Sequence, residues 1–364
     1  MTSRHQAPVE HHDRWPMPRG WPTRRVTVMV AWLLPWLLTV GLAVALHVLH
    51  SPEPVDEGSM PFVMAHDIVA EEVPRAVGPI DHLPGAQQAA FRFTSHFSPM
   101  PAPGPEDWLR IHPERGQTVQ DYVDSHPNEP EPGDHIYILP LGRLPSERGP
   151  TTDELAEHAR RFFGLPVVVL PVRPLVQLDV PSRVQGDHRQ LNATAVLDVL
   201  QAEVPRDAYC LIAVTLEDLY PSDDFNYVFG LARLKSRVGV FSFARYHPAF
   251  FGEVPADDPG FTVDRRLMVR RALKVMSHEI GHMFGVEHCV HLHCVMNGAN
   301  HLSEVDRAPM HLCPVCLRKL HLTLGFDPEA RYRGLAEHYG ALGLDEASDW
   351  AFQRAGYLRR ERGG

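Results

Sequence analysis

The sequence predicts an α/β protein of the α+β kind, built on a mixed and mostly parallel sheet. From residue 135 onward, short runs rich in β-branched residues alternate with segments whose apolar residues recur at helical spacing. An order of strand, helix, strand, helix and strand is typical of parallel strands joined by crossover helices. A chain of 364 residues is also long enough to bury a large core.

The pattern of apolar residues places the individual elements. Strands are expected at 135–141, 167–170 and 209–215, and helices at 118–125, 152–163, 192–204, 264–284 and 345–359. A further strand at 237–244 follows a loop instead of a helix, so we expect it to be an antiparallel edge strand. The helix at 345–359 is amphipathic and is expected to dock on the rest of the domain.

The N-terminal part carries a long uncharged stretch. No Asp, Glu, Lys or Arg occurs within residues 26–49, which are enough to cross a membrane as a helix. Four arginines within 14–25 precede it and three acidic residues within 53–57 follow it. The positive-inside rule then predicts a single-pass membrane protein with residues 1–25 in the cytoplasm and the remainder outside. Two alternatives are a signal peptide, cleaved near Ala43-Val44-Ala45 to release a secreted protein, and a buried core helix.

Composition divides the rest of the chain. Residues 50–104 are rich in proline, glycine and acidic residues, and we interpret them as a linker. Residues 341–364 are interpreted as a C-terminal helix and tail. The net charge of −10 is unfavourable for binding nucleic acid, because phosphates require a basic face.

The run HEIGHMFGVEH, from His278 to His288, has the spacing of a metal site. His278 and His282 are four residues apart, so on a helix they project from one side and can contact a single zinc ion. Gly285 can adopt a positive φ and turn the chain out of the helix, which brings His288 back as a third ligand. Three histidines leave one coordination position open for water, as is typical of a catalytic zinc.

Glu279 supplies the acid–base group of this motif. Its side chain projects about 100° around the helix from His278, which suits it to hydrogen-bond a water at the metal better than to bind the metal itself. We therefore predict hydrolysis by a zinc-activated water, with Glu279 as the general base. The alternative is a chance HExxH on an ordinary helix, and the added Gly285, His288 and Met296 count against it.

Five cysteines occur, and four of them lie within 28 residues: Cys289, Cys294, Cys313 and Cys316. Their spacing fits four thiolate ligands of a structural zinc ion. Two disulfides are the alternative outside the cytoplasm, and a redox C-x-x-C is a third interpretation. A zinc ion here would help to hold the third catalytic ligand, because Cys289 directly follows His288.

The same residues carry a family resemblance. HEIGHMFGVEH, followed by Cys289, Cys294 and Met296 and then by Cys313-Pro314-Val315-Cys316, resembles the archaemetzincins, a branch of the metzincin peptidases. The segments at 218–221, 229–232 and 238–246 also look like family segments, so the resemblance covers roughly residues 105–340.

The resemblance implies a metzincin-like zincin domain over 105–340, with a twisted mixed sheet, an active-site helix and an irregular, zinc-stabilised C-terminal subdomain. Met296 would lie in the Met-turn beneath the metal, and the four cysteines would bind a second, structural zinc. The strand at 238–244 would hold an extended peptide by strand addition. Candidate substrate contacts are therefore Val240, Phe241 and Ser242, together with Tyr246 as a further contact or an oxyanion donor.

Together these observations predict a zinc metallopeptidase with one catalytic and one structural zinc ion per chain. The expected partners are a peptide or protein substrate and a membrane. The alternative is a zinc-stabilised peptide-binding module with little or no turnover. Glu279 favours the enzyme, because a binding module has no need of a general base.

Overall fold

The computed structural model describes residues 66–146, 149–252 and 264–362, and an element lies at or near each strand and helix that the sequence predicts, together with several that it does not. The strands are β1 (His135–Leu141), β2 (Val167–Val169), β3 (Ser182–Gln185), β4 (His188–Asn192), β5 (Ala208–Thr215), β6 (Asp218–Tyr220), β7 (Gly230–Arg233) and β8 (Val238–Ser242). The helices are α2 (His66–Val77), α3 (Gly85–Phe91), α4 (Trp108–Ile111), α5 (Val119–Asp124), α6 (Thr152–Phe163), α7 (Ala193–Ala202), α8 (Arg265–Met283), α9 (Leu302–Arg307), α10 (Pro314–Leu324), α11 (Pro328–Ala341) and α12 (Asp345–Arg362).

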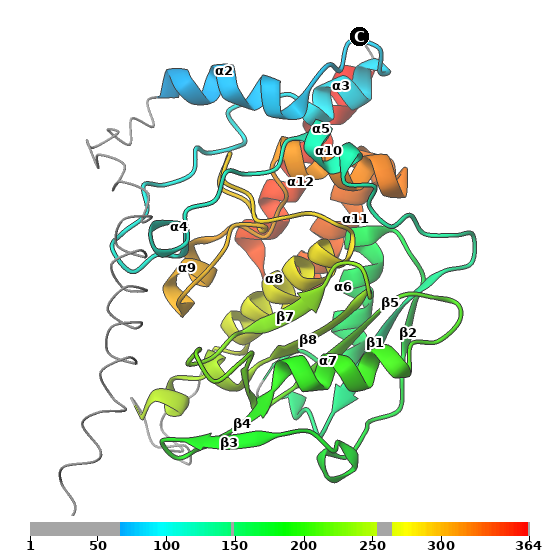
Figure 1. Ribbon diagram of the computed structural model, residues 1–364. Coiled ribbons are helices and arrows are strands. Elements are labelled where there is room, and N and C mark those ends of the chain that lie inside the picture. Colours follow the sequence, from blue (N-terminus) through cyan, green and yellow to red (C-terminus); the bar gives the residue numbers. More distant parts are fainter. Residues whose placement is uncertain (1–65, 147–148, 253–263, 363–364) are drawn as a thin grey trace, which may run out of the picture. The chain divides into compact units, whose positions relative to one another are not determined.

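A mixed five-stranded sheet forms the centre of this part of the chain, in the order β2-β1-β5-β8-β7 (Figure 1). The first four strands are parallel, and β7 runs antiparallel to β8. The prediction that 237–244 forms an antiparallel edge strand is therefore wrong. All five residues of β8 are buried, as an interior strand covered on both faces requires, whereas the half-buried β7 forms the edge.

Helices cover both faces of this sheet, with α7 on one face and α6 and α8 on the other (Figure 1). Alternating side chains of β5 explain this arrangement, because successive residues of a strand point to opposite faces. Ile212 and Val214 belong to the core cluster that includes α6 and α8, while Leu211 and Ala213 belong to the cluster with α7. A smaller sheet, in the order β3-β4-β6, adjoins the α7 side through residues of the same cluster.

The N-terminal helices correct the interpretation of 50–104 as a linker, which does not hold from residue 66 onward. Both α2 and α3 contact α10, and α3 also packs on α12. Phe91 is buried, and Arg354 of α12 donates hydrogen bonds to the carbonyls of Ala89 and Ala90 at 2.9 and 3.0 Å. Frequent prolines between these short helices did not prevent their apolar faces from joining the core.

The predicted membrane segment at 26–49 lies outside the described residues. Within the described residues, no helix combines the length and the apolar character needed to cross a membrane.

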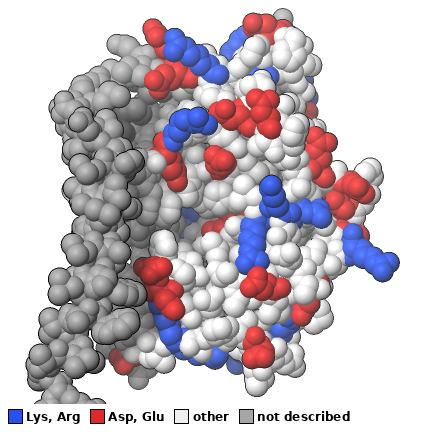
Figure 2. Space-filling view, viewed as in Figure 1, with Lys and Arg blue, Asp and Glu red and all other residues white. Residues whose placement is uncertain are grey.

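The C-terminal part is more helical than the expected irregular subdomain. The longest irregular stretch is 284–301, a shorter one at 308–313 separates α9 from α10, and α10 to α12 follow. The predicted boundary at residue 341 is not visible as a break in packing, because α12 packs along α11 and buries Ala351, Ala355 and Leu358. On the face drawn in Figure 2, acidic and basic side chains are interspersed.

Candidate metal centre

Three histidines converge at the C-terminal end of α8. His278 and His282 lie one turn apart on that helix, and their Nε2 atoms are 3.0 Å apart. The ring of His288 lies 5.2 Å from that of His278 and 5.0 Å from that of His282, measured between centroids. One ring nitrogen from each of the three lies within 4.8 Å of the others. This grouping suits a single zinc ion with metal–nitrogen bonds of about 2.1 Å.

The other nitrogen of each ring is already engaged. The Nδ1 atom of His278 lies 3.0 Å from the carbonyl oxygen of Val295, and that of His282 lies 2.7 Å from the carbonyl oxygen of Val286. The Nδ1 atom of His288 lies 2.8 Å from Oε1 of Glu114. Because each acceptor fixes the proton on Nδ1, each Nε2 is left with a free lone pair for a metal.

Burial keeps the imidazoles of His278 and His282 neutral. It lowers the pKa of His278 to about 3, and it holds the pKa of His282 well below its usual value. The neighbouring ring of His288 acts in the same direction on His278. Neutral imidazole is the form that binds zinc, so the site is prepared for a metal at physiological pH.

A glycine turn brings His288 to the other two histidines, as the sequence predicts. Gly285 has φ of +82°, directly after the C-cap of α8 at Phe284. Two tyrosine hydroxyls bond the carbonyls that the helix end leaves free. Tyr209 donates to Met283 at 3.0 Å and Tyr122 donates to Phe284 at 2.9 Å.

Glu279 lies beside the histidines with a side chain that is 6% exposed. Burial raises its pKa to about 8. Its carboxylate rests against the backbone of β7, since a Cβ atom at Gly230 would lie 2.5 Å from its Oε1. Once ionised, a carboxylate in such an apolar site is a strong proton acceptor, because its surroundings favour the neutral form.

A cavity of about 470 Å³ opens onto these residues. The histidines and Glu279 line one part of it, and β7 contributes Gly230, Leu231 and Ala232. Most of the remaining wall is apolar or aromatic: Trp108, Phe225, Tyr227, Phe229, Val275 and Val295. Such a lining favours apolar side chains of a bound peptide.

The predicted substrate contacts lie elsewhere. Val240 and Phe241 pair with Leu231 and Gly230 of β7 and are fully buried, and Ser242 donates to the carbonyl of Glu217 at 2.6 Å. Tyr246 is also fully buried and does not line the cavity. Since β7 covers β8 on its outer side, the strand that faces the cavity is β7.

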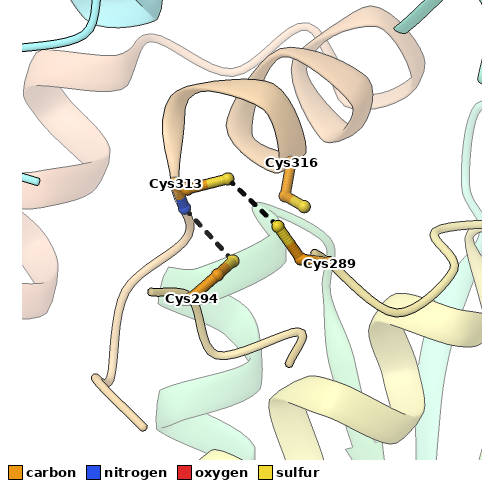
Figure 3. A group of neighbouring side chains, drawn as sticks. All are labelled: Cys289, Cys294, Cys313 and Cys316. Atoms are coloured by element: carbon orange, nitrogen blue, oxygen red, sulfur yellow. Dashed lines mark hydrogen bonds between the residues drawn. The ribbon is translucent and has the colours of Figure 1, made fainter. Parts of the chain in front are cut away.

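Four cysteines form a second cluster, and their sulfur atoms point toward one another (Figure 3). Cys289, Cys294, Cys313 and Cys316 are buried, and their sulfurs lie within 4.8 Å of one another. The sulfurs of Cys289 and Cys313 are 3.6 Å apart, close to the roughly 3.8 Å expected of two thiolates on one tetrahedral zinc. None of the chain's five cysteines, all of which are described, forms a disulfide.

Backbone groups also support thiolates in this cluster. The N–H of Cys313 points to the sulfur of Cys294 at 3.2 Å, and the N–H of Met296 points to the same sulfur at 3.5 Å. Hydrogen bonds from Cys294 and the other two cysteines hold the pKa of Cys289 well below its usual value, whereas burial holds the pKa of Cys294 and that of Cys313 well above theirs, so a bound metal is needed to ionise all four thiols. The residues present therefore fit a tetrathiolate zinc site.

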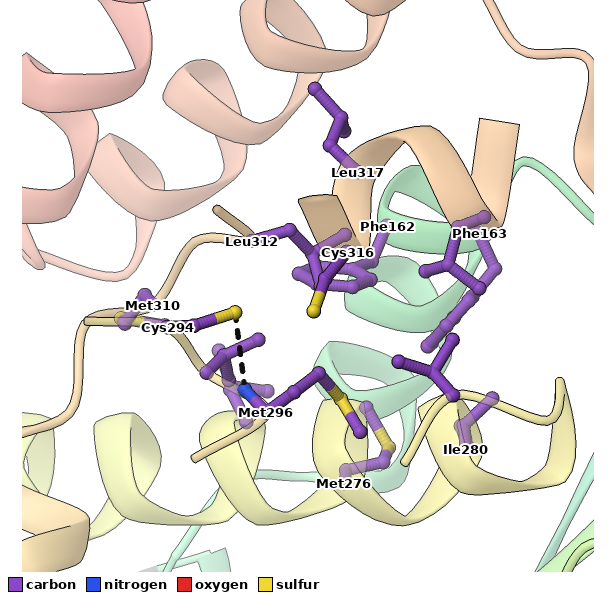
Figure 4. Close-up of a cluster of buried hydrophobic side chains, with 14 of the residues drawn as sticks. Phe162, Phe163, Met276, Ile280, Cys294, Met296, Met310, Leu312, Cys316 and Leu317 are labelled. Carbon is purple, nitrogen blue, oxygen red and sulfur yellow. Dashed lines mark hydrogen bonds between the residues drawn. The ribbon is translucent and has the colours of Figure 1, made fainter. Parts of the chain in front are cut away.

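Met296 links the two clusters. It is fully buried beside Met276 and Ile280 of α8, with Cys294 and Cys316 in the same core cluster (Figure 4). A Cβ atom at Gly281 would lie 2.6 Å from its sulfur, so the turn containing Met296 packs directly on the helix between the two histidines. The role of Met296 as an apolar floor beneath the metal stays a prediction.

Two site residues were missed from the sequence. Glu114 is 174 residues away from His288, and Trp108, whose ring lies 5.1 Å from that of His288, is further still. Neither belongs to a motif with its own spacing, so no local signal marks them. Burial raises the pKa of Glu114, but hydrogen bonds from His288 and Trp108 outweigh this effect and leave the pKa below its usual range.

Known proteins resemble most of this chain. The sequence pattern of Peptidase family M54 matches residues 168–322. Archaemetzincin-2 from Pongo abelii is 35% identical over 278 residues, which cover 70% of this chain and 76% of that protein. Archaemetzincin-2 from Homo sapiens has the same identity and coverage. Archaemetzincin from Methanopyrus kandleri, known from a crystal structure, is 31% identical in sequence to this chain. The match covers 54% of this chain and 99% of the archaeal protein, with a TM-score of 0.41.

Proposed function

Because this chain belongs to peptidase family M54, the archaemetzincins, and is a zinc metallopeptidase, we propose that His278, His282 and His288 bind its catalytic zinc and that Glu279 is the general base. One observation carries the proposal: three imidazole nitrogens converge beside Glu279 while the opposite nitrogen of each ring is held by an acceptor. Each of the three histidines is oriented by its own acceptor, so loss of one acceptor or one imidazole would weaken the binding of zinc.

Each protein group has a defined task in hydrolysis. When bound, zinc supplies a Lewis acid that favours ionisation of water and polarises a carbonyl. Glu279, which lines the cavity beside the histidines, accepts the proton of the attacking water and delivers it to the leaving amine. The apolar lining of the cavity excludes bulk water and strengthens these interactions.

The substrate backbone binds along β7 in this proposal. The strand pairs with β8 on one side only, and Gly230, Leu231 and Ala232 line the cavity. An edge strand offers unpaired N–H and C=O groups to an extended peptide, while alternate side chains of that peptide enter pockets. We thus assign to β7 the role that the sequence suggested for 238–244.

The four cysteines bind a structural zinc in this proposal, which rests on their converging sulfurs and N–H···S contacts. Titration of thiols in the denatured protein, without reductant, separates this site from two disulfides. We expect all five cysteines to react after zinc is chelated. Reaction of only one would support the disulfides instead.

We further propose that residues 26–49 anchor the chain in a membrane, with the catalytic domain on the outer side, from the charge pattern around that stretch. Val176 is 92% exposed, so Val176→Cys offers a reporter for a thiol reagent that does not cross membranes. Labelling in intact cells is expected. Labelling only after permeabilisation would show that the catalytic domain lies on the cytoplasmic side. Recovery of labelled protein from the medium would favour a secreted protein.

Substitution of Glu279 tests the enzymatic proposal. In a peptide-library digest, Glu279→Gln should lose about 10²- to 10⁴-fold in cleavage rate while zinc content stays at the parental value. The matched control is Glu287→Gln, an exposed carboxylate within the same motif, which should cleave at the parental rate. Equal cleavage by Glu279→Gln and the parent would remove Glu279 from the mechanism. A zinc-loaded parent that binds peptides without cleaving them would favour the binding module.

A further inference from the structure

A segment far from the catalytic motif holds the third histidine. We propose that Glu114 is a positioning residue for the catalytic metal, and that residues 108–117 form a strap that keeps His288 in its metal-binding orientation. This inference rests on the proposed function, because it assigns to the strap a task at the same site.

The contact with His288 differs in kind from those of the other two ligands. His278 and His282 are fixed by α8 and bond to main-chain carbonyls. His288 lies beyond the helix, and its Nδ1 atom bonds to a side-chain carboxylate. A ligand in irregular structure has no helix to orient it, so its hydrogen-bond partner determines its direction.

Glu114 is itself held in place for this contact. Trp108 donates its indole N–H to the same oxygen, Oε1, at 2.9 Å, and its ring packs nearly perpendicular to the ring of His288. The carboxylate thus accepts from the tryptophan on one side and the histidine on the other. A carboxylate partner also raises the basicity of an imidazole toward a metal more than a neutral carbonyl does.

Further contacts anchor the beginning of the strap. The main-chain N–H of Trp108 donates to both carboxylate oxygens of Glu304 in α9, at 3.0 and 3.1 Å. The indole ring covers Gly298, where a Cβ atom would lie 2.3 Å from it. The strap therefore packs on the chain that follows Met296.

Gln117 anchors the other end. This side chain is 3% exposed, and its amide donates to the carbonyl of Gly285 at 3.2 Å. Its oxygen accepts from the N–H of Glu287 at 3.2 Å. The glycine turn before His288 is thus held by two bonds from the same strap that supplies Glu114.

Two substitutions at Glu114 test the proposal, with chelator competition as the measurement of zinc affinity. Glu114→Ala removes the acceptor and should weaken binding of the catalytic zinc about 10- to 100-fold. Glu114→Gln keeps an oxygen for both donors but loses the charge, so an intermediate loss of up to about 10-fold is expected. Glu106→Ala is the matched control, because this exposed glutamate lies just before the strap. Its zinc affinity should equal that of the parent.

Melting temperatures of the metal-free proteins separate positioning from general support of the fold. If Glu114 acts by positioning His288, the metal-free Glu114→Gln protein should have the melting temperature of the parent, while its affinity for zinc is lower. If Glu114→Ala fails to fold, Glu114→Gln decides, and parental zinc affinity in that variant overturns the inference.

His288→Ala distinguishes failure of the inference from failure of the proposed function. If His288→Ala loses the zinc and Glu114→Ala and Glu114→Gln keep it at parental affinity, only the inference is overturned. If His288→Ala retains all the zinc of the parent, the histidine site itself is wrong and both proposals are overturned.

Discussion

At the residue scale, the site depends on glycines that admit other groups to the backbone. Gly230 leaves room for the carboxylate of Glu279, and Gly281 leaves room for the sulfur of Met296. A side chain at either position would overlap a neighbour in a close-packed interior, where little space exists for relaxation. Glu279 and Met296 can therefore occupy their positions only because Gly230 and Gly281 have no side chain.

Gly230→Ala tests this dependence. The added Cβ would lie 2.5 Å from Oε1 of Glu279, so the carboxylate must move. Since a misplacement of about 1 Å can cost roughly 100-fold, we expect a loss of this order in kcat/KM with zinc content unchanged. Kinetics on a cleaved peptide and metal analysis provide the measurements.

Gly239→Ala, in the adjacent strand β8, is the matched control because its nearest neighbour would be 3.4 Å away, an ordinary contact. If Gly230→Ala had the kcat/KM of the parent, the proposal that catalysis depends on the position of the Glu279 carboxylate against β7 would be wrong.

At the element scale, α6 supports the active-site helix. His158 of α6 and Ser277 of α8 form a buried hydrogen bond of 2.8 Å, one residue before His278. Thr151 caps α6 and forms a capping box with Glu154, whose carboxylate also pairs with Arg265 at the start of α8. The sequence signature of that cap is local, which explains why the helix was predicted with its correct limits.

Thr151→Ala should lower the free energy of unfolding by about 1 kcal/mol, because the N–H of Glu154 loses its acceptor. Urea denaturation measures the change. Thr152→Ala, at the first helical residue, lacks that capping contact and serves as control. A Thr151→Ala protein as stable as the control would show that the cap does not stabilise the fold.

At the scale of the whole described region, one loop joins the two clusters. The N–H of Cys289 donates to the carbonyl of Met296 at 2.8 Å, and the amide of Asn297 donates to the carbonyl of Cys289 at 2.7 Å. Asn297, which is 7% exposed, therefore braces the loop as well as lining the cavity. Through this loop the proposed zinc among the cysteines would constrain His288, the residue before Cys289.

Cys316→Ser should consequently affect both clusters. We expect loss of the structural zinc, a melting temperature several degrees below that of the parent, and weaker binding of the catalytic zinc. Metal analysis and thermal unfolding measure these effects. Cys210→Ala is the control, since this buried cysteine lies in β5 outside the cluster. An unchanged zinc content in Cys316→Ser would contradict the tetrathiolate site.

Prediction from the sequence was most successful where the signal is local. The strands at 135–141 and 209–215, the helix at 264–284 and the turn at Gly285 were all confirmed, because periodicity and turns depend on near neighbours. It was least successful where distant segments meet. The edge position of β7 and the burial of α2 and α3 follow from pairing and packing that no single segment encodes.

The sequence by itself determined which side chains form the two candidate metal sites. They are His278, His282 and His288, with Glu279 beside them, and the four cysteines, and both sets converge as predicted. Only the tertiary structure decided which strand faces the cavity and which carboxylate holds His288. The physical reason is one of range. Ligands on one helix turn are brought together by helical geometry, whereas Glu114 reaches His288 only after the chain between them has folded.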